Sequence, residues 1–148
     1  MAKTSLTLTI RVDGVRETMA AFQKLPKEAN NSLRDETLKL SKRLAAYVVT
    51  AGRKEGSQAA LVAQTVKARR DRVPVIQAGG TKRLGSRRAP AYKLLFGSEF
   101  GANYLRQFKP HLGRGSYWFF RTVEKEEDEI AAAWRKVADD IAERFARG

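Results

Sequence analysis

Residues Phe96 to Phe120 read FGSEFGANYLRQFKPHLGRGSYWFF, and this stretch says more about the fold than any other part of the chain. It holds three motif-like pieces, Phe-Gly-x-Glu-Phe-Gly, Gln-Phe-x-Pro-His and Gly-Arg-Gly-x-Tyr-Trp-Phe-Phe, with eight aromatic residues, four glycines and one proline. Each large ring can bury about 150–250 Å² in a core or an interface. The stretch places no nucleophile beside a base and no two carboxylates together. It therefore predicts an irregular structure that is held in place by buried aromatic side chains and used for assembly rather than for catalysis.

The sequence before this stretch predicts strands and helices in a mixed order. Apolar and polar residues alternate from Ser5 to Val12, which is typical of a strand with one buried face. Pro26 can open a helix, and apolar residues then recur at helical spacing for about 25 residues until Gly52, where a left-handed cap can end it. The other expected elements are a short helix over Val15–Lys24, a loop over Arg53–Ser57, a helical turn over Gln58–Val62, and strands over Thr65–Arg70 and Arg72–Gln77.

Proline and glycine shape the expectations for the middle of the chain. Pro74 indicates an edge strand, because proline cannot donate to a ladder. Gly79–Pro90 is expected to be a basic, glycine-rich loop and the best candidate for mobility in the free subunit. Ala91–Phe96 is expected to be a short apolar strand or helical turn.

The last part of the chain predicts a helix from about Arg121 to Arg147. Its apolar residues are Ile130, Trp134, Val137, Ile141 and Phe145, at helical spacing. The expected architecture is an α+β fold in one domain, residues 1–148. A small antiparallel sheet is packed by a long helix in the N-terminal half and a C-terminal helix, with long irregular basic loops.

The composition limits the classes of protein that fit. The chain has 148 residues, of which 43% are hydrophobic and 30% charged, which suits one globular domain with a real core. It has no cysteine, so disulfides, thiolate metal sites and cysteine catalysis are excluded. The N-terminus lacks the apolar core of a signal peptide, and no apolar run approaches the roughly 18 residues of a membrane span. We therefore expect a soluble protein made in a cytoplasm.

The net charge of +13 is concentrated in the middle of the chain. Residues 1–52 carry 9 basic and 5 acidic side chains, residues 53–121 carry 15 and 3, and residues 122–148 carry 5 and 8. The middle is thus strongly basic, and the C-terminal part is acidic. This pattern predicts an acidic partner, which could be nucleic acid, an anionic protein surface or the acidic helix of a neighbouring copy.

Four cations in the segment Gly79–Pro90 form the first candidate site. The segment fits neither G-x-x-x-x-G-K-[ST] nor G-x-G-x-x-G, so nucleotide binding is disfavoured. Two interpretations are about equally supported, because charge alone is a weak signal: a solvated loop, or a loop that meets DNA phosphates or an acidic partner subunit. The four residues are Lys82, Arg83, Arg87 and Arg88.

His111 and Glu99 are the residues most easily mistaken for catalytic groups. His111 is the only histidine, and without cysteine or a flanking carboxylate it cannot build a zinc site, so a structural hydrogen bond is favoured. Glu99 is the only acidic residue among residues 73–120. A general base would need a second group to work with, so we favour a structural ion pair of Glu99 with Arg106 or Arg114.

Two runs near the C-terminal helix each allow two interpretations. The run Tyr117 to Phe120 could stack on the bases of a single strand, but at the start of a helix such a cluster more often docks that helix, as core or subunit interface. The acidic run Glu124 to Glu129 is either a solvated helix start, favoured by the helix dipole, or the counterpart of the basic middle of a neighbouring copy in a ring.

The order of these pieces resembles the head–tail neck and tail-completion proteins of long-tailed siphophages that infect actinobacteria. The likeness spans nearly the whole chain: a strand, a long helix that starts at Leu-Pro-Lys-Glu, a basic hairpin, the three motifs and a terminal helix. Its most specific pieces are Glu99-Phe100-Gly101 and Tyr117-Trp118-Phe119-Phe120. Where that family continues Trp-Phe with Pro-Thr, this chain has Phe120-Arg121-Thr122.

The resemblance implies a structural virion protein, not an enzyme, with no catalytic residue, cofactor or metal. It implies a homo-oligomeric ring, with six-fold symmetry favoured over twelve-fold, in the neck or at the top of the tail. Such a ring is assembled in the cytoplasm of the bacterial host. Its partners would be a head-closure or adaptor protein and the tail tube protein, with transient contact to viral DNA in the lumen and none to a membrane. The main alternative is a basic DNA-binding protein of packaging or nucleoid type.

The expected site residues fall into two groups. We expect residues of the basic segment Gly79–Pro90 and of the stretch from Glu99 to Arg114 to meet other subunits. We expect the aromatic residues that follow this stretch to anchor the last helix. The expected interface residues are Lys82, Arg83, Arg87, Arg88, Glu99, Phe100, Tyr104, Arg106, Phe108, His111 and Arg114. The expected helix-anchoring core residues are Tyr117, Trp118, Phe119, Phe120 and Trp134.

Overall fold

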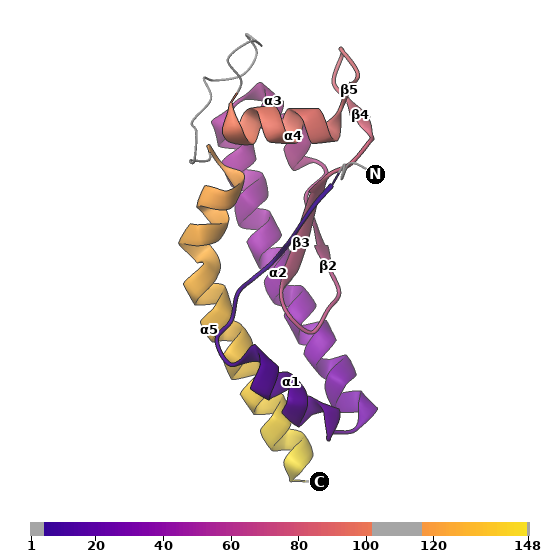
Figure 1. The fold of residues 1–148 in the computed structure, drawn as a ribbon, viewed down its shortest axis with the longest axis vertical. Coiled ribbons are helices and arrows are strands. Elements are labelled where there is room, and N and C mark those ends of the chain that lie inside the picture. The colour runs from indigo at the N-terminus through magenta and orange to yellow at the C-terminus, as the bar shows by residue number, and fades with distance from the viewer. Residues whose placement is uncertain (1–4, 102–116, 148) are drawn as a thin grey trace.

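A computed structural model of the protein describes residues 5–101 and 117–147, in which two long helices lie side by side along an elongated molecule (Figure 1). The predicted fold class is confirmed: long helices in the N-terminal half and at the C-terminus pack with a small antiparallel sheet. The elements in chain order are β1 (Ser5–Thr9), α1 (Val15–Gln23), α2 (Lys27–Glu55), α3 (Ser57–Ala63), β2 (Lys67–Arg69), β3 (Val75–Gly79), β4 (Arg83–Leu84), β5 (Ala89–Pro90), α4 (Ala91–Phe100) and α5 (Phe119–Ala146).

The main sheet has three antiparallel strands in the order β1-β3-β2. Leu6 and Leu8 of β1 stand opposite Ala78 and Ile76 of β3. All four side chains belong to the core or pack against it, so the alternation seen in the sequence does set the buried face of the sheet. The polar residues of β1 lie on the other face and are exposed.

The prediction that Pro74 marks an edge strand is wrong. Pro74 lies just before β3, which is the central strand, and its carbonyl accepts a hydrogen bond of 2.9 Å from the backbone N–H of Ile10. A proline immediately outside a strand withholds no donor from the ladder, so the edge rule does not apply to it.

Buried polar side chains fasten the connection between β2 and β3 onto the two long helices. The Thr37 hydroxyl and the Trp134 indole N–H both donate to the carbonyl of Arg72, over 3.4 and 2.6 Å. The Ser41 hydroxyl accepts from the backbone N–H of Val75 over 3.0 Å. Thr37 and Ser41 are fully buried. Because a buried polar group without a partner costs free energy, these bonds fix where the connection sits.

The predicted end of the long helix at Gly52 is wrong, and so is the predicted loop after it. Helix α2 continues through Gly52 to Glu55, and Gly56 alone separates it from α3. A Cβ atom on Gly52 would lie 2.9 Å from the Trp118 ring and 3.1 Å from the Cβ of Ala63. Glycine at this position therefore serves close packing inside the helix rather than a helix cap.

Helices α2 and α5 run antiparallel, as three contacts along their length show. Gly52 packs on Trp118 near the start of α5, Arg43 forms an ion pair with Glu129, and Thr37 and Trp134 share the Arg72 carbonyl. Most of the predicted apolar stripe of α5 is buried, but Ala138 is buried where Val137 was expected. The fully buried residues of that stripe are Ile130, Trp134, Ala138 and Ile141, while Val137 and Phe145 are only partly buried.

The segment Gly79–Pro90 contains a short hairpin rather than an irregular loop alone. Strands β4 and β5 pair antiparallel, with Leu84 opposite Ala89. Gly85, in the turn, has a φ of +73°, a conformation that favours glycine, and a Cβ there would lie 3.0 Å from a methyl carbon of Leu61. The turn thus rests on α3. The expected mobility of this segment stays a prediction.

The expected short element over Ala91–Phe96 is in fact a helix of 10 residues that extends to Phe100. Gly97 and Ser98 suggest a break in the sequence, but the Ser98 hydroxyl donates to the carbonyl of Leu95 over 3.2 Å inside the helix. The helix ends only at Gly101. The motif Phe-Gly-x-Glu-Phe-Gly, which begins at Phe96, is therefore helical up to Phe100.

Candidate partner interface

The side chain of Glu99 caps the C-terminal helix from a distant point in the chain. Its Oε1 atom accepts hydrogen bonds from the backbone N–H groups of Trp118 and Phe119, over 3.0 and 2.9 Å, and its Oε2 atom accepts one from Phe120 over 2.7 Å. The first N–H groups of a helix have no partner within the helix, and a negative charge is favourable there. Glu99 thus supplies the cap that no side chain at the N-cap residue Trp118 provides.

Two further bonds join the last turn of α4 to the start of α5. The backbone N–H of Tyr117 donates to the carbonyl of Glu99 over 2.7 Å, and the indole N–H of Trp118 donates to the Ser98 hydroxyl over 3.0 Å. The two segments that flank residues 102–116, the end of α4 and the start of α5, are therefore held together at one junction. We call this set of contacts between α4 and α5 the α4–α5 junction.

The expectation that Glu99 lies on an interface surface is wrong. Only 1% of this residue is exposed, and its carboxylate is enclosed within the subunit by the start of α5. The sequence did indicate a paired carboxylate, and the backbone N–H groups of α5 are partners that it did not predict. The expected ion pairs with Arg106 and Arg114 lie outside the described residues, as do the other expected interface residues Tyr104, Phe108 and His111.

The aromatic side chains at this junction form a continuous series from the surface to the core. Phe96 stacks on Phe100 with ring centroids 6.3 Å apart, and Phe100 contacts Phe120 at 5.9 Å. Phe120 contacts Phe119 at 5.7 Å, and Phe119 contacts Trp118 at 5.6 Å. Such ring pairs stabilise beyond their buried area, by roughly 0.5–1.5 kcal/mol each. The series anchors α5 against α4.

Burial separates the expected anchoring residues into two groups. Trp118, Phe119 and Trp134 are fully buried, so none of these rings is available to stack on a nucleic-acid base. Tyr117 and Phe120 are half-buried and pack against the core. The structure therefore favours the core interpretation of this aromatic run over the base-stacking one.

The four cations of the β4–β5 hairpin are all exposed. They are Lys82, Arg83, Arg87 and Arg88, and we call them the hairpin cations. Arg83 donates to the carbonyl of Arg88 over 2.8 Å, which supports the turn. Within the described ranges, no carboxylate forms an ion pair with any of the four. The hairpin thus carries positive charge that this part of the subunit does not neutralise.

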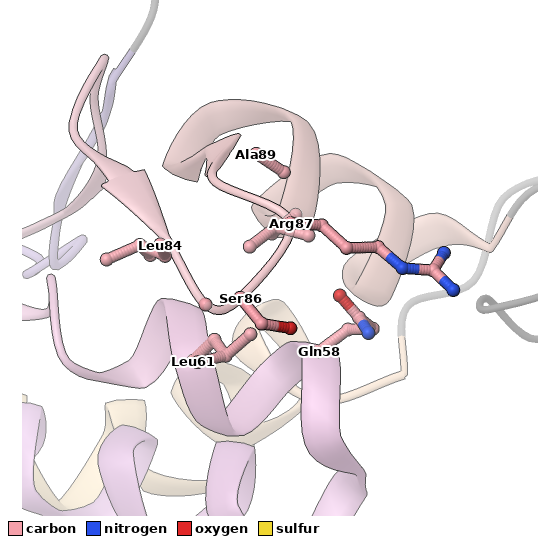
Figure 2. Close-up of a pocket in the computed structure, with 8 residues that line it drawn as sticks. Gln58, Leu61, Leu84, Ser86, Arg87 and Ala89 are labelled. Atoms are coloured by element: carbon pink, nitrogen blue, oxygen red, sulfur yellow. The ribbon is translucent and has the colours of Figure 1, made fainter.

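A small pocket of about 250 Å³ opens beside the hairpin cations (Figure 2). It lies between α3, the hairpin turn and the start of α4. Leu61 and Leu84 lie on one side of it, and the polar ends of Gln58, Ser86 and Arg87 lie on the other. The pocket therefore combines apolar walls with a polar, positively charged rim, and the sequence alone did not predict it.

The acidic run at the start of α5 is only partly used within the subunit. Glu127 accepts a hydrogen bond from the backbone N–H of Arg11 over 3.3 Å, and Glu129 pairs with Arg43. Glu124 and Asp128 are exposed, and no described residue pairs with them. The acidic run can thus serve an outside partner as well as the solvent.

No protein-family model, curated protein or solved structure matches this chain. Among residues 5–101 and 117–147, no three His, Cys, Asp or Glu side chains gather in a way that could hold a metal ion. The helices in the same ranges are too short or too polar to cross a membrane.

Proposed function

We propose that this protein is a structural subunit of a ring at the head–tail junction of a long-tailed phage particle. The ring joins the tail tube to the head and leaves a passage for DNA. The observation that carries the proposal is the capping of α5 by Glu99. It makes the two most specific pieces of the sequence resemblance, Glu99-Phe100-Gly101 and Tyr117-Trp118-Phe119-Phe120, parts of a single structural unit.

In this role, the two motifs stabilise the subunit. A ring subunit must hold its shape while it bears load between two large assemblies. The α4–α5 junction contributes by tying two helices together through buried hydrogen bonds and ring contacts. Charge that is left unpaired on the hairpin and on the start of α5 is then available for neighbouring proteins.

The test is to locate the protein in particles and to remove it. In a phage that encodes this chain, deleting its gene should yield DNA-filled heads and free tails that do not join, as seen by electron microscopy. Complementation with the wild-type gene should restore joined particles, and labelled protein should appear at the junction. Complete particles assembled without the protein would contradict the proposal.

A second candidate function, DNA binding, is favoured by the exposed and unpaired hairpin cations. A protein that binds duplex phosphates loses affinity as salt rises, with a log–log slope of roughly −0.9 per phosphate contacted. Titration of a labelled duplex at several salt concentrations separates the two functions. Tight binding at physiological salt with a steep slope supports DNA binding, whereas negligible binding under those conditions supports the structural role.

A further inference from the structure

Strand β1 forms an open edge of the main sheet. The strand order β1-β3-β2 makes β1 one margin of the sheet (indigo in Figure 1), and no second strand pairs with it in the described ranges. Its sequence, Ser-Leu-Thr-Leu-Thr, holds no charged residue and no proline, which are common means of protecting an edge. An edge of this kind can pair with a strand of another chain.

The hydrogen bonds beside β1 show which of its backbone groups are open. The N–H of Ile10 donates to the carbonyl of Pro74 just beyond the ladder, and from there the bonding alternates residue by residue. The even-numbered residues of β1 therefore bond to β3, while the odd-numbered residues point their N–H and C=O groups away from it. The odd-numbered residues are Ser5, Thr7 and Thr9.

The backbone of β3 agrees with this assignment. The N–H of Val75 donates to the Ser41 hydroxyl over 3.0 Å. The N–H of Gly79 donates to the Thr65 hydroxyl over 2.9 Å. Both residues stand opposite odd-numbered residues of β1, and neither donates to them. No described residue bonds to the outward backbone groups of β1, so these groups are left to water or to another chain.

The side chains of β1 are arranged so that the strand can pair with a second copy of itself. In an antiparallel pair of β1 strands centred on Thr7, this residue stands opposite its own equivalent. Leu6 then stands opposite Leu8 of the second copy, and Ser5 stands opposite Thr9. Apolar side chains thus meet on one face and hydroxyl side chains on the other, and such cross-strand pairs are favourable.

The same register also satisfies the open backbone groups. It places each outward-pointing residue opposite another outward-pointing residue, and every such pair can exchange two backbone hydrogen bonds. Leu6 and Leu8 are only half-buried within the subunit, where they pack against the core. Pairing would therefore cover the remaining apolar surface of these two leucines as well as the backbone.

The other edge of the sheet is a poorer partner for β1. Strand β2 has only three residues, and two of them, Lys67 and Arg69, are exposed cations that discourage pairing. Both stand opposite the residues of β3 that point toward β2, so Ala68 is the residue of β2 whose backbone groups point outward. A contact between β1 and β2 would form fewer backbone hydrogen bonds than a contact between two β1 strands.

We propose that two copies of this chain associate through β1, antiparallel and centred on Thr7, so that their sheets join into one continuous sheet. The contact uses the same surface on both copies and closes at two. It is therefore separate from the contacts that would build a ring. The inference concerns the free subunit in solution and does not depend on the proposed function.

Disulfide trapping tests the register of the contact. The chain has no cysteine, so Thr7→Cys introduces a single thiol into each copy. Opposite residues of an antiparallel pair have Cα atoms about 4.5–5.5 Å apart, which a disulfide can span. Under mild oxidation, Thr7→Cys should form a covalent dimer. Thr9→Cys is the matched control, because its equivalent in the second copy lies roughly 14 Å away along the strand, and it should stay unlinked.

A charge placed at the same two positions tests the contact without a covalent bond. Thr7→Lys brings two ammonium groups opposite each other and should weaken the dimer roughly tenfold or more. Thr9→Lys stands opposite Ser5 and should dimerise as the wild type does. An equimolar mixture of Thr7→Lys and Thr7→Glu should regain association. Sedimentation velocity measures the species, and unchanged melting temperatures at these exposed positions exclude loss of folding.

Three results would overturn the inference. A wild type that stays monomeric at several hundred micromolar would leave the edge to water or to a strand of a different protein. Equal disulfide trapping of Thr7→Cys and Thr9→Cys would exclude the register, and equal dimerisation of Thr7→Lys and Thr9→Lys would place the contact elsewhere. None of these results changes the gene-deletion test, so the inference and the proposed function can fail separately.

Discussion

The α4–α5 junction and the β4–β5 hairpin lie at the same end of the molecule, but they treat polar groups in opposite ways (Figure 1). At the junction, the Glu99 carboxylate is buried and accepts three backbone hydrogen bonds from α5. On the hairpin, four cations face solvent without a carboxylate partner in the described chain. This difference indicates that the α4–α5 junction holds the subunit together, whereas the hairpin is available to contact a partner.

Removal of the Glu99 cap is expected to have the largest effect on folding. In Glu99→Ala, three N–H groups at the start of α5 lose their acceptor in a buried site. Because each buried unsatisfied group costs about 1–3 kcal/mol, the free energy of unfolding should fall by roughly 3 kcal/mol or more. Urea denaturation measures it. Glu99→Gln, which keeps one acceptor oxygen, should lose less. A change within about 0.5 kcal/mol for Glu99→Ala would mean that the junction does not hold the subunit together.

A methyl group on Gly52 is expected to have the next largest effect. In Gly52→Ala the new Cβ would meet the Trp118 ring at 2.9 Å and Ala63 at 3.1 Å. Overpacking of a core costs about 1–3 kcal/mol, while alanine gains about 1 kcal/mol in helix propensity over glycine. The net result should be destabilisation of about 1 kcal/mol in thermal or chemical denaturation.

The matched control for Gly52 is Thr50→Ala, an exposed position of the same helix. It changes helix propensity without creating a contact, so it should be neutral or slightly stabilising. Stabilisation by Gly52→Ala as well would show that Trp118 can shift away from α2 at little cost, and the close contact would then not be a constraint.

The ion pair between Arg43 and Glu129 is expected to contribute little. The two side chains are 41% and 56% exposed, and pairs in such positions contribute about 0–1 kcal/mol. A double-mutant cycle with Arg43→Ala and Glu129→Ala measures the coupling in the free energy of unfolding. A coupling well above 1 kcal/mol would show that surface charge also holds the long helices together.

The smallest effect on folding is expected on the hairpin itself. Arg87→Ala removes an exposed side chain without a described ion-pair partner, so the free energy of unfolding should change by less than about 0.5 kcal/mol. The melting curve of the variant checks this. A loss as large as that of Glu99→Ala would erase the contrast between the two regions, because the hairpin would then be part of the structural core.

The sequence predicted the elements with strong periodicity and failed where a single glycine or proline was interpreted locally. The alternation in β1 and the spacing of Ile130, Trp134 and Ile141 gave the buried faces, because periodicity reports directly on which side chains avoid water. Gly52 was expected to end a helix, but its role is to admit the Trp118 ring. A glycine that caps and a glycine that makes room look alike until the packing partner is known.

The candidate site divides in the same way. The exposure of Lys82, Arg83, Arg87 and Arg88 followed from the charge pattern, whereas the burial of Glu99 did not. One signal was available: α5 begins at an aromatic run with no Ser, Thr, Asp or Asn at its N-cap, and a single carboxylate stands alone upstream. A helix that has no capping side chain at its own N-cap, together with an isolated carboxylate earlier in the chain, suggests that this carboxylate caps the helix.

By itself, the sequence determined the α+β class, the amphipathic faces of the long helices and the excess of positive charge in the middle, because these depend on composition and on short-range periodicity. Only the tertiary structure decided that Glu99 binds the start of α5, that Trp118 rests on Gly52, and that Leu61 and Arg87 share a pocket. Each of these contacts joins residues far apart in the chain. Hydrogen bonding and close packing depend on distance in space, which sequence spacing does not give.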